Sequence, residues 1–307
     1  MTDTDFFSVD PSRAVVAVEG EDRQTFLQGL ISNDTQRVST GLALYSAFLT
    51  PQGKFLHDFA LVDSAGPSGP RILLDPETER RADLIKRLSM YRLRSKVKIV
   101  DLAEDWAVVV FWGPGALSKL GLAVDRGAAR ALGNGVVFTD PRLSALGARA
   151  FLPRAELEAA TAEIGFAAGD IADYERHRAQ AGVPAGSRDL IPDKAILLEN
   201  GFEELGAIDW NKGCYMGQEL TARTRYRGLV RKRLLPVEVS GAAPAPGTPL
   251  MLGEVEAGEF RSMVGNVGLA MIRLEHLDRA QTEGLTAGAT KLRPSVPEWM
   301  KLPEQVG

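Results

Sequence analysis

A single cysteine lies in the stretch KGCYMGQE, which runs from Lys212 to Glu219. Residues 217–226 have a helical pattern, so Cys214 is expected just before a helix N-terminus. The partial positive charge there, together with Lys212, favours the thiolate, which is the form that attacks electrophiles and binds metals. Cys214 is therefore either a reactive thiol or a small apolar residue buried in a core. Its glycine neighbour and basic surroundings favour the first interpretation.

Basic side chains crowd the segment from Lys212 to Arg233, which contains seven basic residues and one acidic residue. Its local charge of +6 contrasts with a net charge of −4 for the whole chain. A run of charge usually indicates a solvated surface. This run adjoins Cys214 and lies at a predicted domain junction, where ligand-binding clefts are common, so it is also a candidate anion-binding surface.

The stretch LTPQGKFLHDF is predicted to form the tip of a β-hairpin and carries a second candidate group, Asp58. Side chains alternate between the two faces of a strand, so Asp58 shares a face with Leu56 and lies among apolar neighbours. A buried carboxylate needs a partner, or its pKa rises until it becomes neutral. Asp58 therefore either takes part in chemistry or fastens its own hairpin.

Composition excludes several classes of protein. The 307 residues are 45% hydrophobic and 25% charged, which predicts two or three globular domains, and the net negative charge argues against a generally basic nucleic-acid binder. Three histidines and one cysteine exclude a disulfide framework and a cysteine-rich zinc site, and neither common phosphate-binding glycine loop is present. The N-terminal residues lack the features of a secretory signal or a transit peptide, and no apolar run reaches the roughly 18 residues of a membrane span. We therefore expect a cytoplasmic protein with no membrane partner.

Hydrophobic patterning predicts two similar α+β blocks followed by a β-rich segment. In the first block, strands are expected at 14–18, 45–50, 55–62, 71–75 and 96–102, and helices at 21–30 and 77–91. In the second, strands are expected at 106–112, 135–139 and 148–152, and helices at 117–120, 154–166, 170–183 and 217–226. From residue 232 onward, short strands separated by glycine and proline favour a small β-barrel or sandwich. We predict an α+β fold with domains at 1–102, 103–229 and 230–307, rather than a doubly wound parallel sheet.

Several motifs together resemble those of the YgfZ family, whose members are related to the glycine-cleavage T-protein, an aminomethyltransferase. The signature K-G-C-Y-x-G-Q-E stands at 212–219, and the pattern A-R-x-x-x-R-G-x-x-x-[KR]-R-L follows at 222–234. The stretches FLQGLISND and YSAFLTPQGKFLHDF match a pattern that the family shares with T-proteins. The resemblance covers nearly the whole chain. It implies two ferredoxin-like α+β units and a C-terminal β-barrel, arranged around a central folate cleft.

The same resemblance assigns residues to binding of tetrahydrofolate or another reduced folate. The assigned positions are Tyr45, Asn33, Asp34, Asp58, Gln180, Arg223, Arg225 and Arg227. The arginines would meet the anionic glutamate tail by charge-assisted hydrogen bonds. Asp58 matches the second aspartate of a paired-aspartate motif of T-proteins, whereas His57 replaces the first and Gln180 replaces a pterin-recognising glutamate. Both replacements remove a negative charge, so we do not expect glycine-cleavage activity.

These matches imply a tetrahydrofolate-binding accessory protein for the assembly or maintenance of iron–sulfur enzymes, including radical enzymes that modify tRNA. Cys214 and Asp58 are the residues expected to carry its chemistry. Its expected partners are a reduced folate and iron–sulfur enzymes or assembly proteins. Two alternatives stay open. One is a folate-dependent transferase of one-carbon groups to a small substrate, and the other is a non-catalytic module whose basic stretch binds tRNA or an acidic partner.

Overall fold

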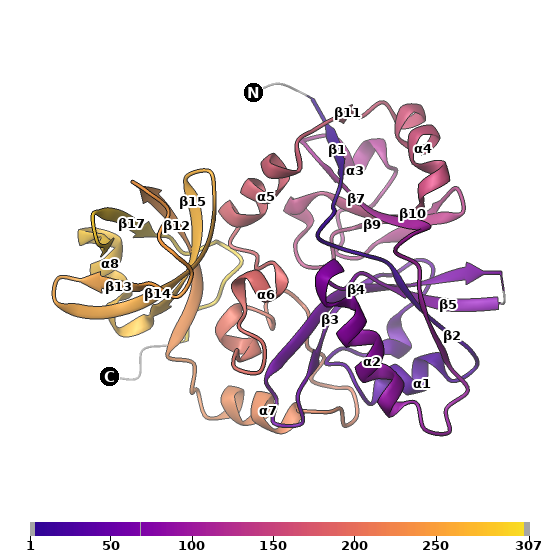
Figure 1. Ribbon diagram of the computed structural model, residues 1–307, viewed down its shortest axis with the longest axis horizontal. Coiled ribbons are helices and arrows are strands. Elements are labelled where there is room, and N and C mark those ends of the chain that lie inside the picture. The colour runs from indigo at the N-terminus through magenta and orange to yellow at the C-terminus, as the bar shows by residue number, and fades with distance from the viewer. Residues whose placement is uncertain (1–3, 68, 304–307) are drawn as a thin grey trace. The chain divides into compact units, whose positions relative to one another are not determined.

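The computed structural model describes residues 4–67 and 69–303 and divides into two compact units (Figure 1). Unit 1 comprises the residues up to Leu49, His57–Ile171 and Leu205–Met216. Unit 2 comprises Thr50–Leu56, Ala172–Glu204 and the residues from Gly217 onward. The KGCYMGQE motif thus begins in unit 1 and ends in unit 2. The division into three domains at residues 102 and 229 stays a prediction.

Unit 1 contains a five-stranded sheet with the strand order β3-β4-β5-β2-β6. Its strands are β2 (Val16–Glu19), β3 (Leu44–Leu49), β4 (Phe55–Gly66, in this unit from His57), β5 (Gly69–Leu74) and β6 (Lys98–Asp101), and its helices are α1 (Arg23–Gln28) and α2 (Arg81–Tyr91). Helix α2 buries Leu84 and Leu88, as its apolar spacing predicts. Tyr91, the last residue of α2, is 37% exposed, and its ring forms an edge-to-face pair with Phe48.

A second sheet of unit 1 has six strands in the order β11-β1-β7-β10-β9-β8. Its strands are β1 (Phe6–Val9), β7 (Trp106–Trp112), β8 (Ala129–Leu132), β9 (Gly135–Thr139), β10 (Ala148–Pro153) and β11 (Ala167–Ala168), and its helices are α3 (Ala116–Lys119) and α4 (Leu157–Ile164). Strand β1, which the sequence pattern did not predict, pairs antiparallel with β7 and parallel with β11. The N-terminal residues therefore complete a sheet whose other strands begin about a hundred positions later in the chain.

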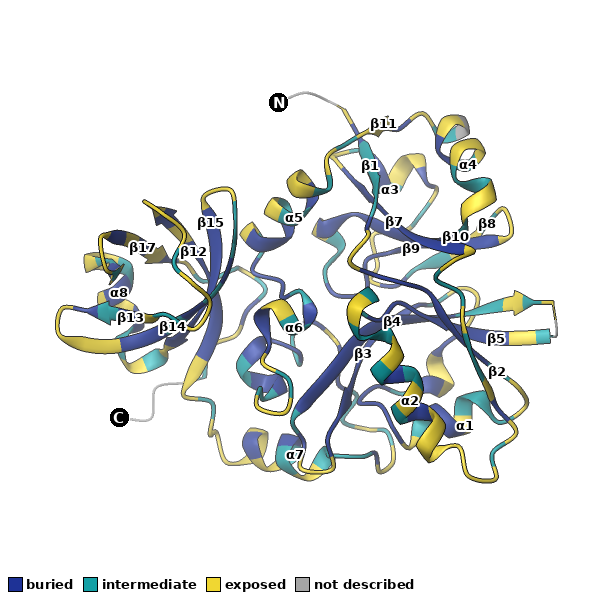
Figure 2. Ribbon diagram, in the orientation of Figure 1, coloured by how far each residue is buried: buried dark blue, intermediate teal, exposed yellow. Residues whose placement is uncertain are grey.

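The two sheets of unit 1 share a core. It contains Ala17, Ala60, Val62 and Leu73 from the first sheet, Val15 just before β2, and Trp106, Val108, Val136, Phe138 and Phe151 from the second sheet. The opposite face of β7 packs with α3 and α4 in a separate cluster. Strand β7 is thus buried on both faces (Figure 2), which explains why its sequence WAVVVFW is an unbroken apolar run rather than an alternating one.

Unit 2 contains a closed six-stranded barrel with the order β12-β15-β14-β13-β16-β17. Its strands are β12 (Lys232–Ser240), β13 (Pro249–Leu252), β14 (Val255–Val264), β15 (Val267–Arg273), β16 (Leu285–Ala287) and β17 (Thr290–Pro294). Its helices are α5 (Ile171–Gln180, in this unit from Ala172), α6 (Gly186–Asp189), α7 (Gln218–Tyr226) and α8 (Leu277–Glu283). The barrel confirms one of the two folds that the glycine and proline spacing favours. Across residues 4–67 and 69–303, no helix has the length and apolarity needed to cross a membrane.

The tip of the β3–β4 hairpin belongs to unit 2, where it lies against the start of α7. Gly53 has a φ of +78°, and a Cβ atom there would lie 2.6 Å from the carbonyl oxygen of Gly217. Only glycine allows both this backbone conformation and this close approach. The hairpin is also held at Phe55, whose N–H donates to the carbonyl oxygen of Ala195 at 3.0 Å. The PQGK turn therefore contacts the segment that ends the KGCYMGQE motif.

Candidate functional site

Cys214 is exposed on a loop of unit 1 that is held at its base by Lys212. The Lys212 ammonium donates hydrogen bonds to the carbonyl oxygens of Ile31 and Asn33, at 2.7 and 2.6 Å. A Cβ atom built on Gly213 would meet no other atom within 4 Å, so the space beside the thiol is open. The loop therefore presents its thiol to solvent from a fixed base.

Further backbone bonds hold the loop on both sides of Cys214. The Met216 N–H donates to the carbonyl oxygen of Gly29 at 3.0 Å, and the Asp209 N–H donates to that of Ser32 at 3.1 Å. The Asp209 carboxylate accepts the N–H groups of the two residues at positions 211 and 212, at 2.8 and 3.1 Å. These bonds reduce the conformational freedom that a partner would otherwise have to remove on binding the thiol.

The structural role of Lys212 is to hold this loop in place. Burial lowers its pKa to about 8, although the carboxylates of Asp34 and Asp209 oppose the shift. At neutral pH most of the amine stays protonated, as its two bonds to carbonyl oxygens require. The ammonium also lies 5.1 Å from the centroid of the Tyr215 ring, which fixes the residue next to Cys214.

Asn33 and Asp34, both assigned to the folate cleft by resemblance, stabilise the segment that the Cys214 loop contacts. The buried Asn33 amide donates to the carbonyl oxygens of Tyr45 and Gly206, at 2.7 and 2.8 Å. The Asp34 carboxylate accepts from the Gln28 amide at 2.9 Å and caps the short helix that follows it. Their side chains therefore serve the local architecture of unit 1.

Asp58 is buried, as strand alternation predicts, and both of its carboxylate oxygens are occupied. The Tyr45 hydroxyl donates to Oδ2 at 2.7 Å, and an Arg13 Nη2 donates to the two oxygens at 3.1 and 3.3 Å. Burial acts to raise the pKa of Asp58, but the Arg13 charge and these hydrogen bonds outweigh it and lower the pKa below its usual value. Asp58 is thus an ionised carboxylate that joins β3 and β4 to Arg13.

Arginine–aspartate pairs extend this network through unit 1. Arg149 donates to Asp75 at 2.6 Å, and Arg142 donates to Asp140 at 2.7 Å while its guanidinium lies 5.9 Å from the centroid of the Tyr45 ring. A cavity of only about 10 Å³ lies among the network residues, enough for one water at most. A ligand as large as a folate does not fit inside this network. The Asp58 carboxylate thus holds the Arg13 and Tyr45 side chains in place.

His57, which replaces an aspartate of the T-protein motif, is buried and held by Asp83. Its Nε2 lies 2.9 Å from Asp83 Oδ2, and its Nδ1 finds no hydrogen-bond partner among the described residues. Burial, followed by the positive charge of Arg80, lowers the pKa of His57 to about 4, although Asp83 opposes the shift. The imidazole is therefore neutral in the folded protein at neutral pH.

This lowered pKa predicts an acid-sensitive contribution to stability. The unfolded chain protonates His57 near pH 6.5, whereas the folded protein does so only near pH 4, so stability falls as the pH falls through this window. The wild type should lose about 1.4 kcal/mol of unfolding free energy per pH unit more than a His57→Gln variant. Urea unfolding at several pH values measures the difference. Equal slopes for the two proteins would contradict it.

The other folate-assigned residues belong to unit 2 and are exposed. Gln180 ends α5, and its amide makes no hydrogen bond to any residue that the structure describes. Arg225 pairs with Glu203 at 3.0 Å, whereas Arg223 and Arg227 have no ion pair with a described residue. The structure thus groups Asn33, Asp34 and the Cys214 loop in unit 1, and leaves the amide and two arginines of unit 2 available to a ligand.

Sequence reasoning missed the arginines that neutralise the buried aspartates. Arg149 offered a signal, because it stands in the apolar strand ARAFL, and a charge at such a position requires a buried partner. Arg13 and Arg142 offered none, since each stands in a turn-like segment and Arg13 reaches Asp58 across 45 positions of the chain. In the described part of the chain, no three His, Cys, Asp or Glu residues are grouped as a metal site.

Comparisons with known proteins agree with this architecture. The family of the CAF17 C-terminal β-barrel domain matches residues 231–302. The solved structure of the glycine cleavage system aminomethyltransferase T from Bartonella henselae superposes with a TM-score of 0.75 at 15% identity, covering 97% of this chain and 86% of that one. At this identity the likeness shows the fold alone. The fold is a mixed α/β fold of the T-protein type that ends in a six-stranded β-barrel.

Two curated relatives are similar over most of their length. The human protein named iron–sulfur cluster assembly factor IBA57, mitochondrial, is 34% identical over 306 residues, which cover 94% of this chain and 83% of the relative. The homologue of that factor from Mycosarcoma maydis is 34% identical over 310 residues, which cover 88% and 74%. The resemblance carried by the motif at 212–219 is therefore confirmed, and the chain belongs to the IBA57/CAF17 family of YgfZ-like proteins.

Proposed function

We propose that this protein is an iron–sulfur cluster assembly factor. The observation that carries the proposal is the 34% identity, over 94% of this chain, to a human protein that bears this name. The exposed Cys214 supports it, because a thiolate is the usual ligand of iron in such clusters. The anchored loop supports it further, since a fixed thiol meets a cluster or its carrier with little loss of conformational freedom.

Cys214 contributes one thiolate in this proposal, and the cluster is cargo rather than a resident cofactor. The chain has one cysteine, whereas clusters are commonly held by four thiolates. The remaining ligands must therefore come from a partner, which is an iron–sulfur enzyme or another assembly protein. A transient mixed ligand set of this kind allows transfer, because no complete site on this chain competes for the cluster.

We also propose that unit 2 contributes to binding of a reduced folate, which carries one-carbon units on its ring nitrogens. The Gln180 amide can pair with the donor and acceptor edge of a pterin, and the exposed Arg223 and Arg227 suit an anionic glutamate tail. Asp58 does not fit as a direct ligand, because Arg13 and Tyr45 occupy its carboxylate. Its role in this proposal is to fix the strands.

Titration calorimetry with tetrahydrofolate tests the folate proposal. We expect saturable binding that weakens about tenfold in a Gln180→Ala variant, the loss of one or two hydrogen bonds to a polar ring edge. The matched control is Gln281→Ala on α8, which removes the same group from another helix of unit 2. No heat at millimolar ligand, or equal losses in both variants, would remove the role assigned to Gln180.

Several finer expectations stay proposals. The clients are proposed to include radical enzymes that modify tRNA, direct contact with tRNA remains an outcome to be tested, and glycine-cleavage activity is not expected. The cytoplasmic location also stays a prediction, since the curated relatives named above are mitochondrial. The two ferredoxin-like units around a central folate cleft remain the predicted arrangement. A one-carbon transferase is the weaker proposal, because a 15% identical structure carries the fold and no activity.

Complementation of a deletion strain tests the assembly function. We expect this chain to restore the activities of several iron–sulfur enzymes in extracts while leaving enzymes without clusters unchanged. Measuring enzymes of both kinds separates a cluster defect from poor growth. Failure to restore any iron–sulfur enzyme, with the protein present at normal abundance, would overturn the proposal.

A further inference from the structure

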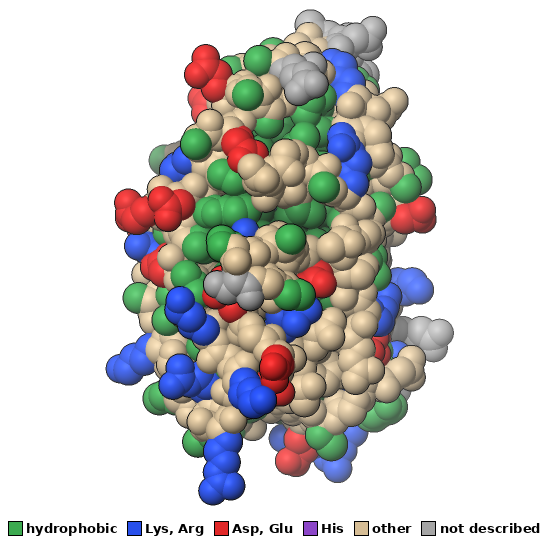
Figure 3. Space-filling view, turned by 90° about the vertical axis from the view of Figure 1, so that its right-hand side faces the viewer, with side chains coloured by type: hydrophobic (Ala, Val, Ile, Leu, Met, Phe, Trp, Pro, Cys, Tyr) green, Lys and Arg blue, Asp and Glu red, His purple; other side chains and the backbone are tan. Residues whose placement is uncertain are grey.

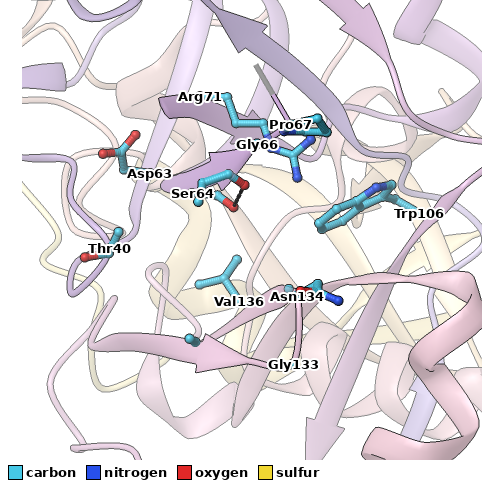
Figure 4. Close-up of a pocket in the computed structure, with 13 residues that line it drawn as sticks. Thr40, Asp63, Ser64, Gly66, Pro67, Arg71, Trp106, Gly133, Asn134 and Val136 are labelled. Atoms are coloured by element: carbon cyan, nitrogen blue, oxygen red, sulfur yellow. Dashed lines mark hydrogen bonds between the residues drawn. The ribbon is translucent and has the colours of Figure 1, made fainter. Parts of the chain in front are cut away.

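Unit 1 contains a cavity of about 510 Å³ that no residue of the Cys214 loop or of the Asp58 network lines. It lies between the β4–β5 hairpin and the β8–β9 hairpin, at the open end of the core shared by the two sheets. Figure 3 shows a hollow in this face, lined largely by hydrophobic side chains. In Figure 4, Arg71 and Trp106 lie on one side of the cavity, with Val136 and Asn134 across from them.

Arg71 is the unusual member of this lining. It is only 5% exposed, and its guanidinium carbon lies 4.7 Å from the centroid of the Trp106 ring. Its Nε is buried without a hydrogen bond, and neither a hydrogen bond nor an ion pair joins the guanidinium to any residue in 4–67 or 69–303. The Nε is the only Arg71 nitrogen that is both buried and without a hydrogen bond among the described residues, so the terminal nitrogens are accessible and free to donate to a ligand that supplies acceptors.

The surrounding backbone is shaped to place this guanidinium. Arg71 stands two positions before the core residue Leu73 on β5, so its side chain faces the same layer between the sheets. A Cβ atom on Gly66 would lie 2.8 Å from Arg71 Cδ and 3.1 Å from its Nε. Because Gly66 has no side chain, space remains for the side chain of Arg71.

Nearby acidic groups limit the charge that this cavity can accept. Glu19 on β2 is directly opposite Arg71 in the sheet, and Asp63 lines the cavity while lying 3.6 Å from Arg23. Burial lowers the pKa of Arg71 and Glu19 opposes the shift, but a guanidinium stays charged in a protein. Because Arg23 pairs with Asp63 and Glu19 offsets part of the Arg71 charge, the cavity has little excess positive charge and suits a monoanion better than a phosphate dianion.

We propose that this cavity binds a small organic carboxylate with a flat apolar body. The carboxylate pairs with the terminal nitrogens of Arg71, whose fork matches two carboxylate oxygens. The apolar body lies between the Trp106 ring on one side of the cavity and the Val136 side chain on the other. Such a ligand differs from an iron–sulfur cluster. The protein therefore has a small-molecule binding site in addition to the proposed assembly function.

Titration of the full-length protein with sodium benzoate tests the site. We expect a dissociation constant of about 1 mM, in line with the affinity that a ligand of this size reaches. Neutral benzamide and inorganic phosphate should each bind at least about tenfold more weakly, because one lacks the charge and the other the apolar body. Arg71→Gln should weaken benzoate binding at least about tenfold, whereas Arg92→Gln, at an exposed arginine of the same unit, should not.

A second variant keeps the test decisive if Arg71→Gln unfolds. Ala131 is exposed on the edge strand β8 and lines the cavity, so Ala131→Phe should fill the space and abolish benzoate binding while Arg71 stays in place. Absence of saturable benzoate binding to the wild type, or unchanged binding in Ala131→Phe, would overturn the proposal. Displacement of benzoate by tetrahydrofolate would also overturn it, since the cavity would then belong to the proposed folate site.

Discussion

Replacing Cys214 with alanine is expected to reduce the iron–sulfur enzyme activities of the complemented strain to those of the deletion strain. Alanine keeps the loop backbone but removes the only thiol in the chain, so no other side chain can replace its sulfur ligand. The protein should remain as stable as the wild type, because the side chain is exposed and a substitution there changes stability by less than about 0.5 kcal/mol. The measurement is enzyme activity in extracts at matched protein abundance.

Two controls separate thiol chemistry from loop structure. Asn211→Ala changes an exposed neighbour in the same loop and should leave complementation intact. The alkylation rate of Cys214 against pH, in native and in denatured protein, reports whether the folded loop activates the thiol. A fully active Cys214→Ala strain, with a native thiol that reacts more slowly than the denatured one, would show that the residue has no chemical role.

Replacing Arg13 with methionine should destabilise unit 1 by about 3–5 kcal/mol, the cost of removing one member of a buried ion pair. Arg13 is 8% exposed and bonds the Asp58 carboxylate, as well as the carbonyl oxygens of Asp58 and Asp75 at 3.0 and 3.2 Å. Methionine fills much of the same space but leaves a buried negative charge whose only remaining hydrogen-bond donor among the described residues is the Tyr45 hydroxyl. Urea unfolding at neutral pH measures the change.

Arg87→Met is the matched control for this prediction. Arg87 pairs with Asp83 on α2 at 2.8 Å, but its side chain is 32% exposed, so its loss should cost less than about 1 kcal/mol. Combining Arg13→Met with Asp58→Asn should cost less than the sum of the two single changes, because the second removes the charge that the first leaves unpaired. A loss for Arg13→Met no larger than that for Arg87→Met would contradict the account of the network.

Local pattern predicted the elements whose burial is regular. Strands β7 and β9 have the predicted bounds, since seven and five consecutive buried residues leave no doubt about their extent. The helical spacing of Leu84 and Leu88 likewise predicted α2. Strand β1 was missed because its four residues FFSV are only partly buried and become a strand through pairing with β7 and β11, which the local pattern does not contain.

The candidate site shows the same contrast between features set by local spacing and features set by contacts between distant residues. The motif at 212–219 and the alternation around Asp58 identified the thiol and the buried carboxylate from local spacing. The bonds that define their surroundings are distant in the chain: Lys212 reaches Ile31 across 181 positions, and Arg149 reaches Asp75 across 74. Arg71 remained unnoticed for a different reason, since a single arginine at a strand position gives no sign of having no partner until the fold is known.

Strand β11 and the segment Leu205–Met216 come late in the chain, and this sets the order in which unit 1 can form during synthesis. The sheet formed by β2 to β6 is complete once Asp101 has left the ribosome, but β1 must wait for β7 and then for β11 at Ala167. At about 5–20 residues per second, the emerging chain carries an unpaired N-terminal strand for on the order of ten seconds. The segment Leu205–Met216 arrives later still, so the anchors of Cys214 close only after both sheets have formed. A chain truncated before Lys212 therefore contains the residues of both sheets but lacks the thiol loop.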